Sequence, residues 1–207
     1  MKLSVVIPFY NEENMIQKMY DELVKEINQI TKAEFEIIFI NDGSKDRTFE
    51  RMLAIAAADS RVKYISFSRN FGKEAGTIAG LEYATGEAVI LMDGDLQHPP
   101  ALIPQMIAAY EEGYDVVSAR RTRTGEKPHR TFLAKHFYKL ANKMMDIELM
   151  DGVSEFRLFS RKVVNAIISM QEYNRFSKGI FAWVGFNEKV IEYENQVRTV
   201  GETKYSL

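Results

Sequence analysis

Two aspartates, Asp93 and Asp95, directly follow the apolar run of residues 89–92. Side chains two residues apart in an extended chain point to the same side, and Gly94 between them lets a ligand approach the backbone. Adjacent carboxylates repel each other and therefore need a cation. Oxygen-only ligands at a strand end suit Mg²⁺ or Mn²⁺ carrying a diphosphate. The same residues also fit a solvated acidic turn after a strand.

Two further acids follow predicted strands: Glu12 comes after residues 3–7, and Asp42 comes after residues 35–40. Carboxylates accept hydrogen bonds from ribose hydroxyls and base N–H groups, and they can hold a metal. The glycine-rich fingerprint of a Rossmann dehydrogenase and the P-loop pattern are both absent. The acids therefore predict a nucleotide held as a metal–diphosphate complex rather than by a glycine-rich cradle.

Strands and helices alternate through the first 120 residues. Asn11 is expected to cap the first helix, whose apolar residues run from Met15 to Ile27 at helical spacing. This order predicts an α/β fold, with a mostly parallel central sheet and helices on both faces. The predicted strands cover residues 3–7, 35–40, 62–67, 88–92 and 116–119, and the helices that follow the first one cover 48–58, 74–84 and a segment starting at Pro99-Pro100.

The second half is less regular. It predicts a helix over residues 131–145, a strand over 155–159, a helix over 161–170 and strands within 187–200. A chain of 207 residues fits one domain. We divide it into residues 1–120, which carry the acids predicted to bind a nucleotide, and residues 121–207.

Composition excludes several classes of function. The chain has no cysteine, so disulfides, thiolate metal sites and a cysteine nucleophile are excluded. The net charge of −2 gives no global attraction to nucleic acid. No apolar run approaches the roughly 18 residues of a membrane span, and no signal peptide is recognisable at the N-terminus.

A basic segment follows the fifth predicted strand. Most basic runs of this kind are simply exposed to solvent. Binding of nucleic acid is disfavoured, because the chain is nearly neutral overall and no aromatic residues are interleaved with the basic ones. Arginine in particular suits phosphate, because its planar fork binds two oxygens at once. The segment contains Arg120, Arg121, Arg123, Lys127 and Arg130.

Three motifs resemble family 2 glycosyltransferases of the GT-A fold: residues 5–12 (VVIPFYNE), 41–46 (NDGSKD) and 93–100 (DGDLQHPP). Three more are similar to the branch that glycosylates polyprenyl phosphates, which includes dolichyl-phosphate mannose synthase. They are residues 68–74 (SRNFGKE), 156–158 (FRL) and 198–205 (RTVGETKY). The resemblance covers nearly the whole chain, and it implies that residues 1–120 bind the nucleotide sugar and residues 121–207 bind the acceptor.

The resemblance implies a role for individual residues. Asp93 and Asp95 would hold Mg²⁺ or Mn²⁺, with Asp95 the closer, catalytic ligand and Gln97 a third. The residues that would bind the donor are Pro8, Tyr10, Glu12, Asp42, Lys73 and Asp93. The acceptor phosphate would be gripped by Arg120, Arg130, Arg157, Arg198 and Lys204. Structural alternatives stay open for Glu12 as a helix-start acid, Asp42 as an Asx turn and Lys73 as a solvated lysine.

One position departs from the branch. The branch usually has Gly-Asp before Phe-Arg-Leu, and that Asp is the favoured catalytic base, whereas this chain has Ser154 and Glu155. The carboxylate persists with one more methylene. The remaining candidates are interpreted as structural. Trp183 is expected to be a packing residue, with sugar stacking as the alternative, and His98, His129 and His136 are expected to be surface residues without metal-ligand spacing.

The resemblance implies an inverting transferase that moves one sugar from a UDP- or GDP-sugar to an undecaprenyl or dolichyl phosphate. It also implies a place at the cytoplasmic face of the cell membrane, where C-terminal membrane segments beyond Leu207 would hold it. We expect no nucleic-acid partner, and a homo-oligomer stays open. The alternatives are a family 2 enzyme acting on a glycan hydroxyl and a catalytically silent nucleotide-sugar-binding module.

Overall fold

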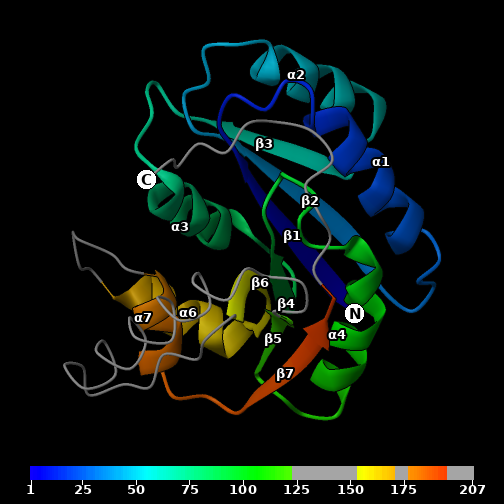
Figure 1. The fold of residues 1–207 in the computed structure, drawn as a ribbon, viewed down its shortest axis with the longest axis vertical. Helices are drawn as coiled ribbons and strands as arrows, with labels where there is room; N and C mark the ends of the chain where they lie inside the picture. The colour runs from blue at the N-terminus through cyan, green and yellow to red at the C-terminus, as the bar shows by residue number, and fades with distance from the viewer. Residues whose placement is uncertain (123–152, 171–176, 195–207) are drawn as a thin grey trace.

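The computed structural model describes residues 1–122, 153–170 and 177–194. Within these residues the strands form one seven-stranded sheet in the order β3-β2-β1-β4-β6-β5-β7 (Figure 1). The strands are β1 (Lys2–Phe9), β2 (Glu34–Asn41), β3 (Val62–Ser66), β4 (Ala88–Leu91), β5 (Val116–Arg121), β6 (Val153–Ser160) and β7 (Glu188–Tyr193).

The sheet is mostly parallel, as predicted. β1 runs parallel to β2 and β4, β2 to β3, and β5 to β7. The exception is β6, which lies between β4 and β5 and is antiparallel to both. This arrangement inserts a strand from the second half of the chain directly beside the strand that precedes Asp93.

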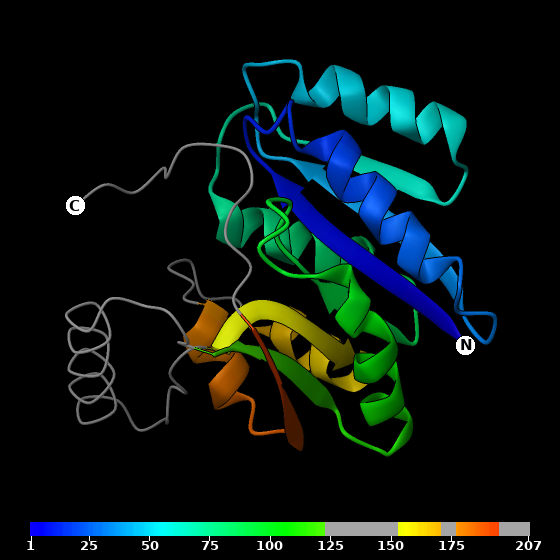
Figure 2. The same ribbon diagram turned by 45° about the vertical axis from the view of Figure 1, so that its right-hand side comes forward.

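Helices cover both faces, because alternate side chains of each central strand point to opposite sides. On one face Leu3, Val5 and Ile7 pack in a core with α1, α2 and α4; on the other, Val6 packs with α3 and α6. Figure 2 shows α1 and α3 on opposite sides of β1. The helical segments are α1 (Ile16–Ile27), α2 (Thr48–Ala58), α3 (Lys73–Tyr83), the 3₁₀ turn η1 (Pro100–Leu102), α4 (Ile103–Glu111), α6 (Arg161–Ser169) and α7 (Ser177–Trp183).

The predicted capping of the first helix is wrong. α1 begins at Ile16, and Met15 before it makes no side-chain cap. Asn11 instead adopts a left-handed backbone conformation with φ of 52°, and its Oδ1 accepts a hydrogen bond from the Lys45 backbone at 2.8 Å. Its amide side chain therefore ties the loop after β1 to the loop after β2.

The predicted helix at 131–145 lies outside the described residues, as does the end of the predicted strand region beyond residue 194. In the described ranges, no helix has the length and apolar character needed to cross a membrane.

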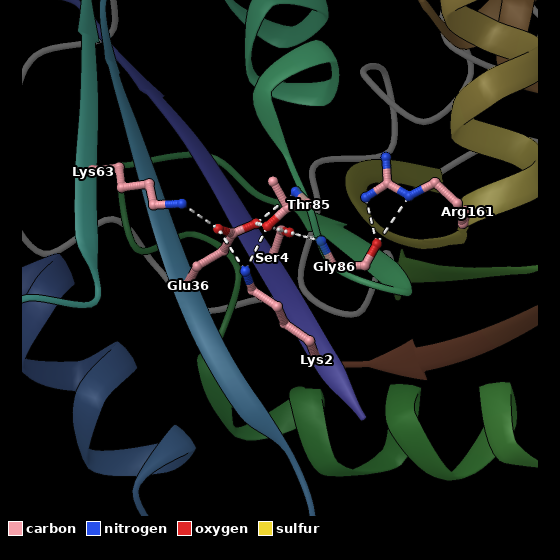
Figure 3. Close-up of polar contacts among 7 residues, drawn as sticks. All are labelled: Lys2, Ser4, Glu36, Lys63, Thr85, Gly86 and Arg161. Atoms are coloured by element: carbon pink, nitrogen blue, oxygen red, sulfur yellow. Dashed lines mark hydrogen bonds and ion pairs between the residues drawn. The ribbon is translucent and has the colours of Figure 1, made fainter.

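The amino-terminal ends of the strands are fixed around a buried carboxylate, Glu36 on β2 (Figure 3). Its oxygens accept hydrogen bonds from Ser4 Oγ at 2.6 Å, Lys63 Nζ at 2.8 Å and the Thr85 backbone at 2.6 Å. Lys2 Nζ lies 3.4 Å away. One side chain thus joins β1, β2, β3 and the loop that leads from α3 into β4, at the opposite end of the strands from Asp42 and Asp93.

Candidate active site

The carboxyl ends of β1, β2 and β4 lie side by side, which brings the acid-bearing loops together. Phe9 on β1 is paired with Asn41 on β2, and the backbone of Met92, after β4, donates to the Val6 carbonyl. A Cβ on Gly94 would lie 2.3 Å from the Phe9 ring, so only glycine fits at this point of the turn. Gly94 is therefore needed for this turn to pack against Phe9, whether or not a ligand also approaches its backbone.

The Asp93 carboxylate has two charged or polar neighbours. Its Oδ1 lies 2.5 Å from Lys73 Nζ, and its Oδ2 lies 3.4 Å from His98 Nε2. Burial raises the pKa of Asp93, but the hydrogen bond from His98 and the charge of Lys73 outweigh it and hold this pKa far below the ordinary value. Asp93 is therefore an ionised acid in the folded protein.

Lys73, the first residue of α3, lies between two carboxylates. Besides Asp93 it contacts Glu155 Oε2 on β6 at 2.8 Å. Burial lowers the pKa of Lys73, while the charges of Asp93 and Glu155 raise it by more, so the net pKa is above the ordinary value. The sequence predicted a donor-diphosphate contact for this lysine, and the structure places its ammonium beside the first aspartate of the pair.

Glu155 reaches the site because β6 pairs with β4. The register sets Arg157 opposite Leu91, so residue 155 lies just beyond the end of β4. Its side chain is only 15% exposed. The structure thus brings together Asp93, Lys73 and the predicted catalytic carboxylate.

His98 was interpreted as a surface residue, and this was wrong, because the residue is 8% exposed. Its Nδ1 lies 2.7 Å from the hydroxyl of Tyr193 at the end of β7, and its ring lies near Phe156 on β6. Sequence reasoning missed Tyr193, which is 95 residues away and carries no local signal. His98 and Tyr193 together position the Asp93 side chain.

Asp42 is buried and holds the loop that leads to Lys73. Its Oδ1 accepts from the Phe71 backbone at 2.7 Å, and its Oδ2 accepts from the Gly72 backbone at 3.0 Å. The neighbouring turn is closed by Asn41, whose Oδ1 accepts from the Ser44 backbone. Asp42 therefore positions the backbone before Lys73, and its role in donor binding stays a prediction.

The other predicted donor residues follow β1. Pro8, Tyr10 and Glu12 are all partly exposed at the carboxyl end of the sheet. The Glu12 backbone N–H donates to Thr48 Oγ1 at 2.8 Å, which joins this segment to the start of α2. The segment is therefore held in place next to the Asp42 loop.

Asp95 and Gln97 lie in the turn after β4, and both are partly exposed. Asp95 Oδ1 accepts a hydrogen bond from the Gln97 backbone at 3.1 Å. Within the described ranges, no group of three or more His, Cys, Asp or Glu side chains comes together as a complete metal site. The residues still fit Mg²⁺ or Mn²⁺, because such ions often bind one or two carboxylates and take their other ligands from substrate phosphates and water.

The predicted acceptor residues are only partly described. Arg120 is half-buried and pairs with Glu192 across β5 and β7. Arg157 is 5% exposed, with its guanidinium 5.2 Å from the centre of the Phe181 ring and Nη1 3.5 Å from Glu188 Oε1; burial lowers its pKa. Residues outside the described ranges are Arg123, Lys127, Arg130, Arg198, Lys204, His129 and His136.

The packing role predicted for Trp183 is wrong. Its side chain is 67% exposed at the end of α7. The aromatic residue of this helix that does pack is Phe181, whose ring lies 4.8 Å from that of Phe159. The sequence analysis predicted no helix at these residues, so it could not tell which side chains of α7 face inward.

The fold and the cluster of acids at the strand ends define a glycosyltransferase of the GT-A fold. The chain belongs to glycosyl transferase family 2, whose family model matches residues 4–168.

Named relatives match the chain over nearly all of its length. CsbB of Bacillus subtilis (strain 168), which carries a glycosyltransferase name, is 50% identical over 99% of this chain and 62% of its own length. The prophage bactoprenol glucosyl transferase homolog of Escherichia coli (strain K12) is 44% identical over 100% of this chain and 67% of its own. The bactoprenol glucosyl transferase of Shigella phage SfX is 43% identical over 100% and 68%. The chain spans 62–64% of the first three relatives.

Solved structures share the fold at low identity. Staphylococcus aureus TarS 1-349 in complex with UDP superposes with a TM-score of 0.66 at 20% identity, covering 94% of this chain and 60% of that one. The mannosyltransferase PcManGT from Pyrobaculum calidifontis, in complex with GDP-Man and Mn²⁺, gives 0.66 at 17% identity, covering 92% and 54%. These similarities confirm the predicted α/β architecture of the GT-A type.

Proposed function

We propose that this chain catalyses the metal-dependent transfer of one sugar from a nucleotide diphosphate sugar to a polyprenyl phosphate, with inversion at the anomeric carbon. The observation that carries this proposal is the match over the full chain to relatives named bactoprenol glucosyl transferase, at 43–44% identity. Because the acceptor is a membrane lipid, the reaction would take place at a membrane surface, and the family resemblance implies the cytoplasmic face.

The donor would bind beyond the carboxyl ends of β1, β2 and β4, where Tyr10, Glu12 and the Asp42 loop lie beside the Asp93–Asp95 turn. Asp93, Asp95 and Gln97 would hold Mg²⁺ or Mn²⁺. A bound divalent cation supplies charge neutralisation of the leaving diphosphate. The ionised state of Asp93 supports this assignment, since a metal ligand has to be deprotonated.

The acceptor phosphate oxygen would attack the anomeric carbon in line with the departing diphosphate. A phosphate monoester is largely ionised at neutral pH, so little of the catalytic work lies in deprotonating the nucleophile. The main task is to hold two anions close together, by positioning and electrostatic stabilisation. Arg120 and the predicted residues Arg130, Arg198 and Lys204 would serve that task.

The state of Glu155 favours this acceptor over a glycan hydroxyl. A sugar hydroxyl has to lose a proton, which requires an available general base. The Glu155 carboxylate instead lies 2.8 Å from the Lys73 ammonium, so its negative charge already has a partner. An acceptor that arrives ionised makes no such demand.

The direct test is a transfer assay with radiolabelled UDP- and GDP-sugars, undecaprenyl phosphate and Mn²⁺. We expect the label to enter the lipid fraction, and we expect chelator to stop the reaction. Transfer to a glycan but not to the lipid phosphate would contradict the proposed acceptor. Binding of the donor without any transfer would indicate a silent binding module.

Asp95→Asn should abolish transfer while leaving the fold intact, because a divalent site loses one of its two carboxylate charges. The matched control is Asp21→Asn on the exposed side of α1, which removes the same charge away from the site. Near-normal turnover of Asp95→Asn at limiting Mn²⁺ would show that the metal assignment is wrong. Circular dichroism melting of both variants checks that the fold is kept.

A further inference from the structure

Lys73 occupies the position of a cation in the candidate donor site. Its Nζ lies 2.5 Å from Asp93 Oδ1 and 2.8 Å from Glu155 Oε2, so one ammonium bridges two carboxylates that come from different strand ends. The second oxygen of Asp93 faces His98 Nε2 at 3.4 Å. Both oxygens of this carboxylate therefore already have neighbours that can donate a hydrogen bond.

A metal ion and the ammonium would compete for the same oxygen. A divalent cation bound by Asp93 needs an oxygen of that carboxylate in its coordination shell, and a second positive charge about 2.5 Å from the same oxygen repels it. Three features hold Lys73 where it is: its place as the first residue of α3, Gly72 at φ 92° before it, and the Asp42 bonds to the Phe71 and Gly72 backbone. The backbone at the start of α3 therefore fixes the position from which the Lys73 side chain reaches the two carboxylates.

We propose that Lys73 is the resident counter-ion of the donor site: it neutralises both Asp93 and Glu155 when no divalent cation is bound, and it has to leave Asp93, while staying beside Glu155, before a cation binds there. This inference rests on the proposed function, since it concerns the same metal–diphosphate site. Two consequences follow. The metal alone binds weakly, and a nucleotide diphosphate strengthens metal binding because its negative charge offers the released ammonium a new partner. Lys73 is in this way a positioning residue that couples metal and donor binding.

The test measures Mn²⁺ affinity by calorimetry without nucleotide. Lys73→Met keeps the length and helix propensity of the side chain but removes its charge. We expect Lys73→Met to bind Mn²⁺ roughly ten- to hundred-fold more tightly than the wild type, as removal of one competing charge-assisted contact implies. Lys73→Arg, which keeps the charge, should bind as weakly as the wild type.

Lys25→Met is the matched control. It removes the same charge from an exposed site on α1, where Lys25 lies 3.8 Å from Glu22, and it should leave the Mn²⁺ affinity unchanged. Lys73→Met binding Mn²⁺ as weakly as the wild type, or more weakly, would overturn the proposal. Equal tightening in the Lys25→Met control would also overturn it, because the effect would then be one of net charge.

A second measurement needs no variant and covers the case in which Lys73→Met does not fold. Reductive methylation of the wild-type chain, followed by peptide mass spectrometry, reports how accessible each lysine amine is. Saturating Mn²⁺ should increase the labelling of Lys73 and leave that of Lys25 unchanged. Unchanged or reduced labelling of Lys73 would contradict the proposal. Neither measurement involves sugar transfer, so failure of the proposed reaction and failure of this inference are separable.

Discussion

Glu155 and Asp93 share one counter-ion, so a substitution at position 155 changes more than one carboxylate. Lys73 lies within 2.8 Å of both acids. Loss of the Glu155 charge would remove one of the two carboxylate partners of Lys73 and leave the Asp93 contact in place. The effect on catalysis then depends on whether Glu155 orients charge or accepts a proton.

Glu155→Gln is expected to lower kcat by roughly ten- to hundred-fold, the size of one charge-assisted contact, with little change in nucleotide affinity. Glu155→Asp should remain active, because a carboxylate at this position is retained. Steady-state kinetics with separate nucleotide-binding measurements check both. If Glu155 were a general base, the wild-type rate profile would contain an acidic pKa that disappears in the Gln variant. Wild-type turnover of the Gln variant would leave Glu155 as a structural partner of Lys73.

Local pattern predicted the acids of the site but not their partners. Asp42, Asp93 and Asp95 each stand within three residues of the end of an apolar run, and the carboxyl ends of parallel strands meet at one edge. His98 and Tyr193 are 95 residues apart, and the Tyr193 hydroxyl reaches the His98 ring through the placement of β7. Contacts of this kind depend on strand order, which periodicity does not encode.

At the scale of elements, β6 and α3 together bring Glu155 and Lys73 to the site. The sequence predicted a strand near residues 155–159, and the structure has β6 at Val153–Ser160. Its insertion between β4 and β5, antiparallel to both, was not predictable from its apolar pattern, because both faces of a central strand are buried in either direction. α3 contributes Lys73, its first residue, to the same site.

The close approach of α3 to β1 depends on Gly80. A Cβ at this position would lie 2.2 Å from Val6 Cγ1, so Gly80→Ala forces the helix away from the strand. We expect a loss of about 1–3 kcal/mol in the free energy of unfolding and a weakened donor site, since Lys73 moves with the helix. Urea unfolding and nucleotide binding measure the two effects.

Gly76→Ala in the same helix is the control for this substitution. Its Cβ would meet Ile40 and Pro8 at 3.5 Å, an ordinary contact, and alanine raises helix propensity. The control should therefore be neutral or stabilising. Equal destabilisation of both variants would show that the α3–β1 contact is not what Gly80 provides.

At the scale of the whole molecule, the two ends of the sheet use charge differently. The carboxyl end holds Asp93 beside a lysine that a ligand can displace. The amino end holds Glu36, whose hydrogen bonds come from β1, β3 and the loop before β4 (Figure 3). This buried carboxylate was not singled out from the sequence, because an acid within an apolar strand shows no sign of the partners that other strands bring to it.

Glu36→Gln should destabilise the protein by about 2 kcal/mol at pH 7, because the charge-assisted bonds from Lys63 and Ser4 lose their anion.

Burial raises the pKa of Glu36, but the bonds from Lys63, Ser4 and Thr85 outweigh it, so the folded-state pKa lies well below the ordinary value of 4.5. A depressed folded pKa contributes stability above the unfolded pKa, and that contribution is lost as pH falls toward the folded pKa. The stability difference between wild type and variant should therefore be constant from pH 7 to about 5 and narrow below about 4.5. Urea unfolding across this range measures it. Glu50→Gln, at an exposed ion pair with Arg47, should change stability far less than Glu36→Gln at every pH, because exposed ion pairs contribute little. A difference for Glu36→Gln that widens on acidification would show that the buried carboxylate is protonated more readily in the folded protein than in the unfolded chain.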